Sequence, residues 1–266
     1  MAAEEHRVRS GSLFCTIGRM NPPTSGHMRL IEELFKEASK VGGRVVLFMS
    51  SSTGRDKDKD NPMECSDKKE YLEKMIIKRN PELDVPFEII CGNPVVAVFG
   101  YVARHRPAEV TIVLGKEEEK ETMGESIRKG FFDAYVPRFK KGSDQATIDA
   151  ATKLAREKTE ERRRTYGGIT LTLKYIDRPP NSISATIVRS HVTEKRKNDF
   201  NSVYEGYLQQ KNKNGLFMKI QNGMNRIERN FNNSNSNNAR NTKRAKTNRN
   251  STSKPKTKSP KSRKSA

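Results

Sequence analysis

Short apolar runs alternate with longer amphipathic stretches along most of this chain. Five runs rich in strand-forming residues recur between polar segments and predict strands at 12–17, 44–50, 87–92, 109–115 and 168–177. Helical patterns separate them at 26–39, near 71–79, at 95–104, 116–129 and 143–164. This alternation predicts an α/β fold: an open, mostly parallel, five-stranded Rossmann-like sheet with helices on both faces.

Different sequence features predict the individual helices. The first, at 26–39, places five apolar residues on one face: Met28, Ile31, Leu34, Phe35 and Ala38. The stretch at 95–104 contains several β-branched residues, but Pro94 suits the first turn of a helix. The stretch at 143–164 is long and polar, and Ser143 is its predicted N-cap.

The end of the chain has a different composition. A helix is predicted to begin near Ser184, and residues 200–231 are weakly helical in pattern. Beyond them the sequence is rich in Asn, Ser, Lys and Arg, with almost no apolar residue to bury. We therefore expect a domain over 10–231 that ends in a helical extension, followed by a disordered basic tail over 232–266.

The charge of the chain points to a polyanionic partner. The formal net charge is +20, and eleven of these positive charges lie in residues 232–266, which contain no Asp or Glu. The remaining +9 makes the domain basic as well. Non-specific nucleic-acid binding through the tail, another polyanion and nuclear import all fit this pattern, and so does a compositional bias without function.

The cysteines and the lengths of the apolar runs indicate the cellular compartment of the protein. Cys15, Cys65 and Cys91 are scattered, and two of them lie in apolar runs, where we expect buried, reduced thiols. The chain has no CxxC pair and only four separated histidines, so no zinc site is predicted. It shows neither an apolar signal segment nor a run long enough to span a membrane. We expect a cytoplasmic or nuclear protein, with association with a virus particle as a further option.

The loop after the first predicted strand carries the first candidate chemistry. It reads "GRMNPPTSGH" over 18–27, in which Gly18 and Gly26 allow close backbone approach. His27 then falls in the first turn of a helix, where unpaired N–H groups attract anions. Thr24 and His27 can both donate hydrogen bonds to a phosphoryl group. A proline-stiffened turn with a surface histidine is the alternative interpretation.

The loop after the last predicted strand carries the second candidate. Ser184 is a good N-cap, and Thr186 and Arg189 fall on one face of the helix that follows. Helical side chains lean toward the helix N-terminus, so Arg189 can reach an anion held there. A capped helix with a surface arginine is the alternative. At the switch point of a parallel sheet, these two loops are expected to lie close together.

Together the loops resemble the two signatures of the HxGH nucleotidyltransferase superfamily, the cytidylyltransferase-like proteins. The first loop is similar to the signature with Thr in place of the first His, the form found in nicotinamide-mononucleotide adenylyltransferase-type enzymes. The second matches the pattern I-S-x-T-x-x-R at Ile183, Ser184, Thr186 and Arg189. The resemblance covers roughly residues 10–195.

The resemblance implies transfer of a nucleotidyl group, in adenylyl form, from a nucleoside triphosphate to a phosphorylated acceptor, with release of pyrophosphate. It implies that His27 and Thr24 contact the donor near its α-phosphate, and that Ser184, Thr186 and Arg189 hold the outer phosphates. Nucleotide-binding positions are implied for Gly18, Arg19, Asn21, Gly26, Gly115 and Lys116. A Mg²⁺ ion is expected to bridge the phosphates with few protein ligands.

One region departs from the family pattern. Related enzymes often carry a Gly-x-Asp element after the fourth strand, whereas this chain reads "LGKEEEKE" from Leu114, without an Asp. Lys116 could hold phosphate there instead. The departure leaves a second function open: a catalytically degenerate nucleotidyltransferase fold that binds nucleic acid or builds a virus particle. A tRNA-charging synthetase is a third and weaker option, because the second motif differs.

Overall fold

The computed structural model describes residues 11–51, 61–177 and 182–250, with side chains as far as Asn232. Five strands form one fully parallel sheet in the order β3-β2-β1-β4-β5. They are β1 (Ser12–Gly18), β2 (Arg44–Ser50), β3 (Phe87–Gly92), β4 (Glu109–Gly115) and β5 (Thr170–Ile176). The predicted α/β class and its parallel sheet are confirmed.

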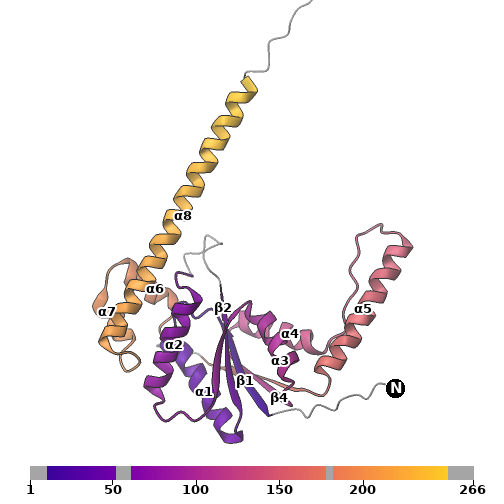
Figure 1. Ribbon diagram of the computed structural model, residues 1–266, viewed down its shortest axis with the longest axis horizontal. Helices are drawn as coiled ribbons and strands as arrows, with labels where there is room; N and C mark the ends of the chain where they lie inside the picture. Colours follow the sequence, from indigo (N-terminus) through magenta and orange to yellow (C-terminus); the bar gives the residue numbers. More distant parts are fainter. Residues whose placement is uncertain (1–10, 52–60, 178–181, 251–266) are drawn as a thin grey trace, which may run out of the picture.

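Helices cover both faces of the sheet (Figure 1). One apolar core joins the sheet to α1, α2 and the helices α6 to α8, and a second joins it to α3 and α4. Among the described helices, none combines the length and the apolarity needed to cross a bilayer. Their bounds are α1 (Ser25–Val41), α2 (Cys65–Arg79), α3 (Pro94–His105), α4 (Glu118–Phe132), α5 (Gln145–Tyr166), α6 (Ala185–Thr193), α7 (Lys197–Val203) and α8 (Gln210–Asn250).

Helix α1 forms as its pattern predicts. The five apolar residues expected on one face are all buried against the sheet: Met28, Ile31, Leu34, Phe35 and Ala38. The helix ends at Gly42, whose φ of 62° is the left-handed conformation that glycine adopts without a steric cost. The short loop after β1 leads directly into α1, so the N-terminus of α1 lies at the carboxyl end of β1.

The strand order creates a switch point beside β1. This strand pairs with β2 on one side and β4 on the other, and the connections run outward from it in both directions. The loops after β1 and β4 therefore separate at the carboxyl edge of the sheet and leave a crevice between them. This edge is where the candidate site lies.

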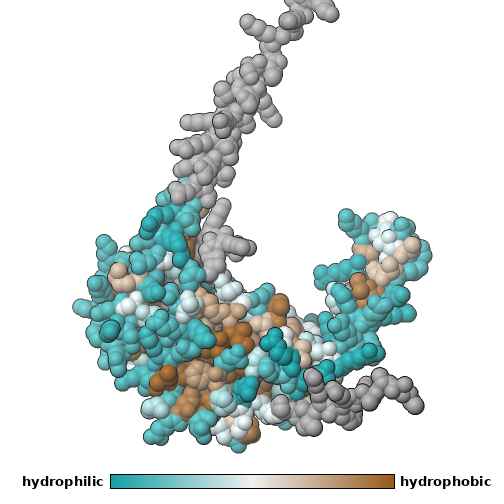
Figure 2. All heavy atoms as spheres, viewed as in Figure 1, coloured by the Kyte–Doolittle hydropathy of each residue, from teal (hydrophilic) through white to brown (hydrophobic). Residues whose placement is uncertain are grey.

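Helix α5 extends away from the sheet (Figure 1), and the space-filling view shows the same arm standing apart from the body (Figure 2). Its N-cap is Asp144 and not Ser143, which corrects the sequence prediction. The Asp144 carboxylate accepts a 2.7 Å hydrogen bond from the Thr147 N–H, and this bond lowers the pKa of Asp144. The Ser143 hydroxyl instead donates to the carbonyl of Lys140 at 2.8 Å. Both residue types cap helices well, and the turn before the helix decides which of them is used.

The C-terminal helix is longer than the pattern indicated. The backbone of α8 is helical to Asn250, past the predicted onset of disorder at Asn232. Its first half buries Leu216, Phe217 and Ile220 against the body. A helix nucleated in this way adds further turns at little cost. The disorder expected for the tail stays a prediction, and residues 251–266 lie outside the described part of the chain.

The cysteine expectation needs a correction. Cys15 is a buried free thiol, as expected, and burial raises its pKa. Cys91, however, is paired with Cys65 in a disulfide, with Cα atoms 6.2 Å apart. The sequence hides this pairing, because only the fold brings the start of α2 beside the end of β3.

Candidate functional site

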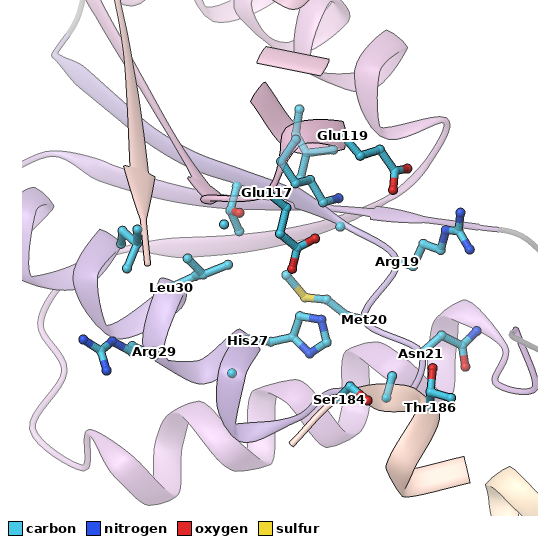
Figure 3. A pocket seen from close by; sticks show the side chains of 18 of the residues that line it. Arg19, Met20, Asn21, His27, Arg29, Leu30, Glu117, Glu119, Ser184 and Thr186 are labelled. Atoms are coloured by element: carbon cyan, nitrogen blue, oxygen red, sulfur yellow. The ribbon is translucent and has the colours of Figure 1, made fainter. Parts of the chain in front are cut away.

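A pocket of about 360 Å³ opens at the carboxyl ends of β1, β4 and β5 (Figure 3). Its walls come from the loop after β1, the first turns of α1 and α6, and the start of α4. The two candidate loops, far apart in sequence, thus meet at one cavity. Both His27 and Arg189 line it.

Two contacts with Thr24, at the start of α1, orient the His27 ring. Thr24 is the N-cap, and its N–H donates a 3.0 Å hydrogen bond to Nδ1 of His27. The Thr24 hydroxyl lies 2.9 Å from the same nitrogen. A nitrogen that accepts a hydrogen bond carries no proton, so the proton of the neutral ring is on Nε2. Figure 3 shows the His27 ring directed into the pocket.

The first turn of α6 supplies the opposite side. The N–H of Ile187 donates to the Ser184 hydroxyl at 3.3 Å, so Ser184 is the N-cap that the sequence predicted. Ser184 and Thr186 both line the pocket. Two helix N-termini therefore converge on the cavity, and each offers N–H groups that have no partner within the helix. Such an arrangement attracts an anion with several charged oxygens.

Arg189 ties the two loops together. Its guanidinium donates to the carbonyl of Asn21 at 2.8 Å and to the Thr186 hydroxyl at 3.1 Å. The residue is 9% exposed. Part of its hydrogen-bonding capacity is therefore spent on the protein, while the side chain still borders the pocket.

The Asn21 side chain makes its hydrogen bonds to the segment before α2. Its amide oxygen accepts from the Met63 N–H at 3.0 Å, and its amide nitrogen donates to the Met63 carbonyl at 3.2 Å. Asn21 is only 2% exposed. Its carbonyl serves Arg189, and its amide fastens the loop to residues 61–63.

Most of the predicted site residues meet at the pocket, and two do not line it. Thr24 is fully buried, and it orients the His27 ring without lining the pocket itself. The Lys116 side chain is 56% exposed and pairs with Asp177 at 3.3 Å. The predicted residues that do line the cavity are Gly18, Arg19, Asn21, Gly26, His27, Gly115, Ser184, Thr186 and Arg189.

Several pocket residues were missed by the sequence reasoning. The family pattern has an Asp two positions after the glycine, and Glu117 occupies that position after Gly115. Figure 3 shows its carboxylate reaching into the cavity toward Met20. Glu119, Lys120 and Asp177 add further charge on the same side. The signal for Glu117 was present in the sequence, because it is a carboxylate at the position where the pattern has Asp.

Lys68 lies behind the first loop. It is fully buried at the start of α2, and its ammonium donates to the carbonyls of Ser50 and, at 3.4 Å, of Arg19. Burial lowers its pKa to about 8. The ammonium thus joins the carboxyl ends of β1 and β2 directly beneath the pocket loop.

A comparison with protein families agrees with this geometry. A profile of the cytidylyltransferase-like family matches residues 15–191, about two thirds of the chain. The chain belongs to the cytidylyltransferase-like family of the HxGH nucleotidyltransferase superfamily. The match contains both pocket loops and ends within α6, so this cytidylyltransferase-like chain carries α7 and α8 beyond the matched region.

A solved structure similar to this cytidylyltransferase-like chain is Thermotoga maritima TmcAL bound with alpha-thio ATP. The identity is 17% and the TM-score 0.41, over 81% of this chain and 56% of that one. The chain thus spans little more than half the length of TmcAL. No curated protein matches the sequence.

Proposed function

We propose that this protein transfers a nucleotidyl group, from ATP by preference, to a phosphorylated small-molecule acceptor with release of pyrophosphate. The observation that carries the proposal is the convergence of two helix N-termini, with His27 and Arg189, on one pocket. A triphosphate is an elongated polyanion that can contact both helix starts at once. The Thr form of the first motif, shared with adenylyltransferase-type enzymes, supports ATP as the donor.

In the proposed reaction, an oxygen of the acceptor phosphate attacks the α-phosphorus of the donor. The new P–O bond forms as the bond to the β-phosphate oxygen breaks, and pyrophosphate leaves. No covalent protein nucleophile is required, because such transfer depends on in-line placement and on stabilising the developing charge. His27 would donate from Nε2 to an oxygen on the α-phosphate, where that charge grows.

The second loop would hold the leaving group. The first N–H groups of α6 and the hydroxyl of Thr186 can donate to the β- and γ-phosphates. Arg189 would add a positive charge at the same end of the pocket. Because the leaving group is bound before and after the bond breaks, Arg189 should contribute to donor binding as well as to transfer.

A Mg²⁺ ion fits this site as part of the proposal. The described residues contain no cluster of three or more His, Cys, Asp or Glu side chains that could hold a metal ion. The donor phosphates would therefore supply most of its ligands, with Glu117 as the candidate protein carboxylate. When bound, such an ion would neutralise charge on the phosphates.

The tail adds a proposed partner of a different kind. Residues 232–266 carry eleven Lys or Arg residues and no acidic residue. We infer non-specific binding of nucleic acid or another polyanion, driven by contacts to phosphates. This binding would place the domain near a polyanion without taking part in the transfer.

The test is a screen for pyrophosphate release with each of the four nucleoside triphosphates and a panel of phosphorylated acceptors, with Mg²⁺ present. His27→Ala should slow the release that the wild type shows by roughly 10²–10³-fold. His105→Ala is the matched control, because His105 stacks on Tyr101 at the end of α3, away from this pocket. Equal activity in wild type and His27→Ala would contradict the proposal.

A binding protein without catalysis is the second candidate. The observation that favours it is the use of two Arg189 donors on protein oxygens, in place of a free guanidinium. Nucleotide binding without pyrophosphate release from any acceptor would support it.

A further inference from the structure

A single peptide group connects His27 to a residue near the C-terminal helix. The Tyr204 hydroxyl donates a 2.7 Å hydrogen bond to the carbonyl of Pro23. The N–H of the same peptide group belongs to Thr24 and donates to Nδ1 of His27 at 3.0 Å. The order of contacts is therefore Tyr204 hydroxyl, Pro23–Thr24 peptide, His27 ring.

The surroundings of Tyr204 hold its hydroxyl in place as a hydrogen-bond donor. It is fully buried, between α7 and α8, and packs against Phe200 with ring centroids 5.0 Å apart. Burial raises the pKa of its phenol, so the hydroxyl keeps its proton and donates. A hydrogen bond to a peptide carbonyl also polarises the N–H on the other side of the same group, which strengthens the bond to His27.

The loop that contains this peptide needs external support. Met20 has a φ of 46°, a left-handed conformation that costs energy for a residue with a side chain. Side chains from outside the loop hold it by its carbonyls: Lys68 at Arg19, Arg189 at Asn21 and Tyr204 at Pro23. Of these three, only Arg189 lines the pocket among the described residues.

We propose that Tyr204 is a positioning residue for His27, acting through the Pro23–Thr24 peptide to fix the ring orientation and keep the proton on Nε2. The inference rests on the proposed function for its effect on transfer, but its effect on the His27 ring does not. Tyr204 lies outside the family match, which ends at residue 191. The C-terminal extension would therefore complete the site and not merely follow it.

The test compares two Tyr→Phe variants. Tyr204→Phe removes only the hydroxyl and keeps the aromatic packing. Tyr166→Phe is the matched control, since its hydroxyl also donates to a main-chain carbonyl, that of Phe99, at 3.3 Å. Tyr166 and Phe99 both pack against the core on the opposite face of the sheet from Tyr204. Each variant loses one hydrogen bond from a tyrosine hydroxyl to a main-chain carbonyl. If Tyr204 only stabilised the fold, the two variants should therefore change the His27 ring and the activity to a similar extent.

The first readout is the ¹⁵N NMR signature of the His27 ring. We expect the Nε2–H tautomer in wild type and in Tyr166→Phe, and a mixture of tautomers in Tyr204→Phe. The second readout is kcat/KM, which should fall on the order of 10-fold in Tyr204→Phe and about twofold or less in Tyr166→Phe. In a His27→Ala background, Tyr204→Phe should cause no further loss, because its effect passes through the ring.

The outcomes separate the inference from the proposed function. A protein that shows no transfer but loses the single tautomer in Tyr204→Phe would keep the inference and remove the function. An unchanged His27 signature in a folded Tyr204→Phe protein would overturn the inference, and so would full additivity with His27→Ala. If Tyr204→Phe does not fold, Pro23→Ala and Phe200→Leu perturb the same contact from either side, and the NMR readout decides in the same way.

Discussion

The guanidinium of Arg189 donates a 2.8 Å hydrogen bond to the main-chain carbonyl of Asn21, 168 positions earlier in the chain. This bond joins the second motif of the family to the first. It means that one side chain both borders the pocket and holds the opposite loop in place. Loss of Arg189 should therefore affect the fold and the ligand together.

Arg189→Ala should weaken nucleoside triphosphate binding and reduce stability. It removes a positive charge from the pocket and leaves the buried Asn21 carbonyl without this donor, at a cost of about 1–3 kcal/mol. Arg189→Lys should recover only part of either effect, because an ammonium cannot reproduce the two-pronged guanidinium geometry. Calorimetric titration with ATP and urea unfolding measure the two effects. Full recovery of both by lysine would show that charge alone matters.

His27→Ala should chiefly slow the transfer step. Its donor matters most where charge develops, and loss of one such donor costs roughly 10²–10³-fold in kcat. Thr24→Val should reproduce part of that loss without touching the pocket wall, because the Thr24 hydroxyl lies 2.9 Å from the ring. Steady-state kinetics for both variants, with circular dichroism to confirm folding, provide the measurement. A normal kcat in His27→Ala would remove this histidine from the mechanism.

Lys68 should make stability depend on pH in the alkaline range. Its pKa is lowered to about 8 by burial, whereas the unfolded chain has the ordinary value of 10.5. Between these values the unfolded state binds the extra proton, so the free energy of unfolding should rise with pH. The rise is limited to roughly 3 kcal/mol over the interval.

The measurement is urea unfolding of wild type, Lys68→Met and Lys69→Met between pH 7 and 10. The wild type and the control, in which exposed Lys69 is replaced, should gain stability in parallel. Lys68→Met should gain less, because it has no proton to lose at this position. Parallel curves for all three proteins would mean that Lys68 titrates normally in the folded state.

A chain cut after residue 231 should keep its fold and lose most of its affinity for nucleic acid. The cut removes eleven basic residues and almost no apolar ones, while the part of α8 that packs on the body remains. Binding to a non-specific DNA duplex should weaken at low salt, and its dependence on salt concentration should flatten. Thermal melting and fluorescence anisotropy give the two measurements. A large drop in melting temperature, or unchanged affinity, would show that the boundary lies elsewhere.

The sequence by itself determined the fold class and most of the pocket. Strand runs such as 44–50 are continuous and apolar because both faces of a central parallel strand are buried, and this signal is local. The helix cap at Ser184 was also predictable, because capping uses side chains within three residues of each other. The cap at Thr24 was not predicted, and the structure assigns it. Two helix starts after two strands were enough to predict where an anion would bind.

The tertiary structure alone decided how these parts are held. Glu117 was readable as an acidic residue, but its direction into the cavity depends on how α4 packs. The Cys65–Cys91 pair, the Lys68 contact beneath the loop and the Tyr204 bond to Pro23 join residues 18 to 181 positions apart. Contacts of this kind leave no periodic trace in a single sequence, because each partner is satisfied only after the helices have packed around the sheet.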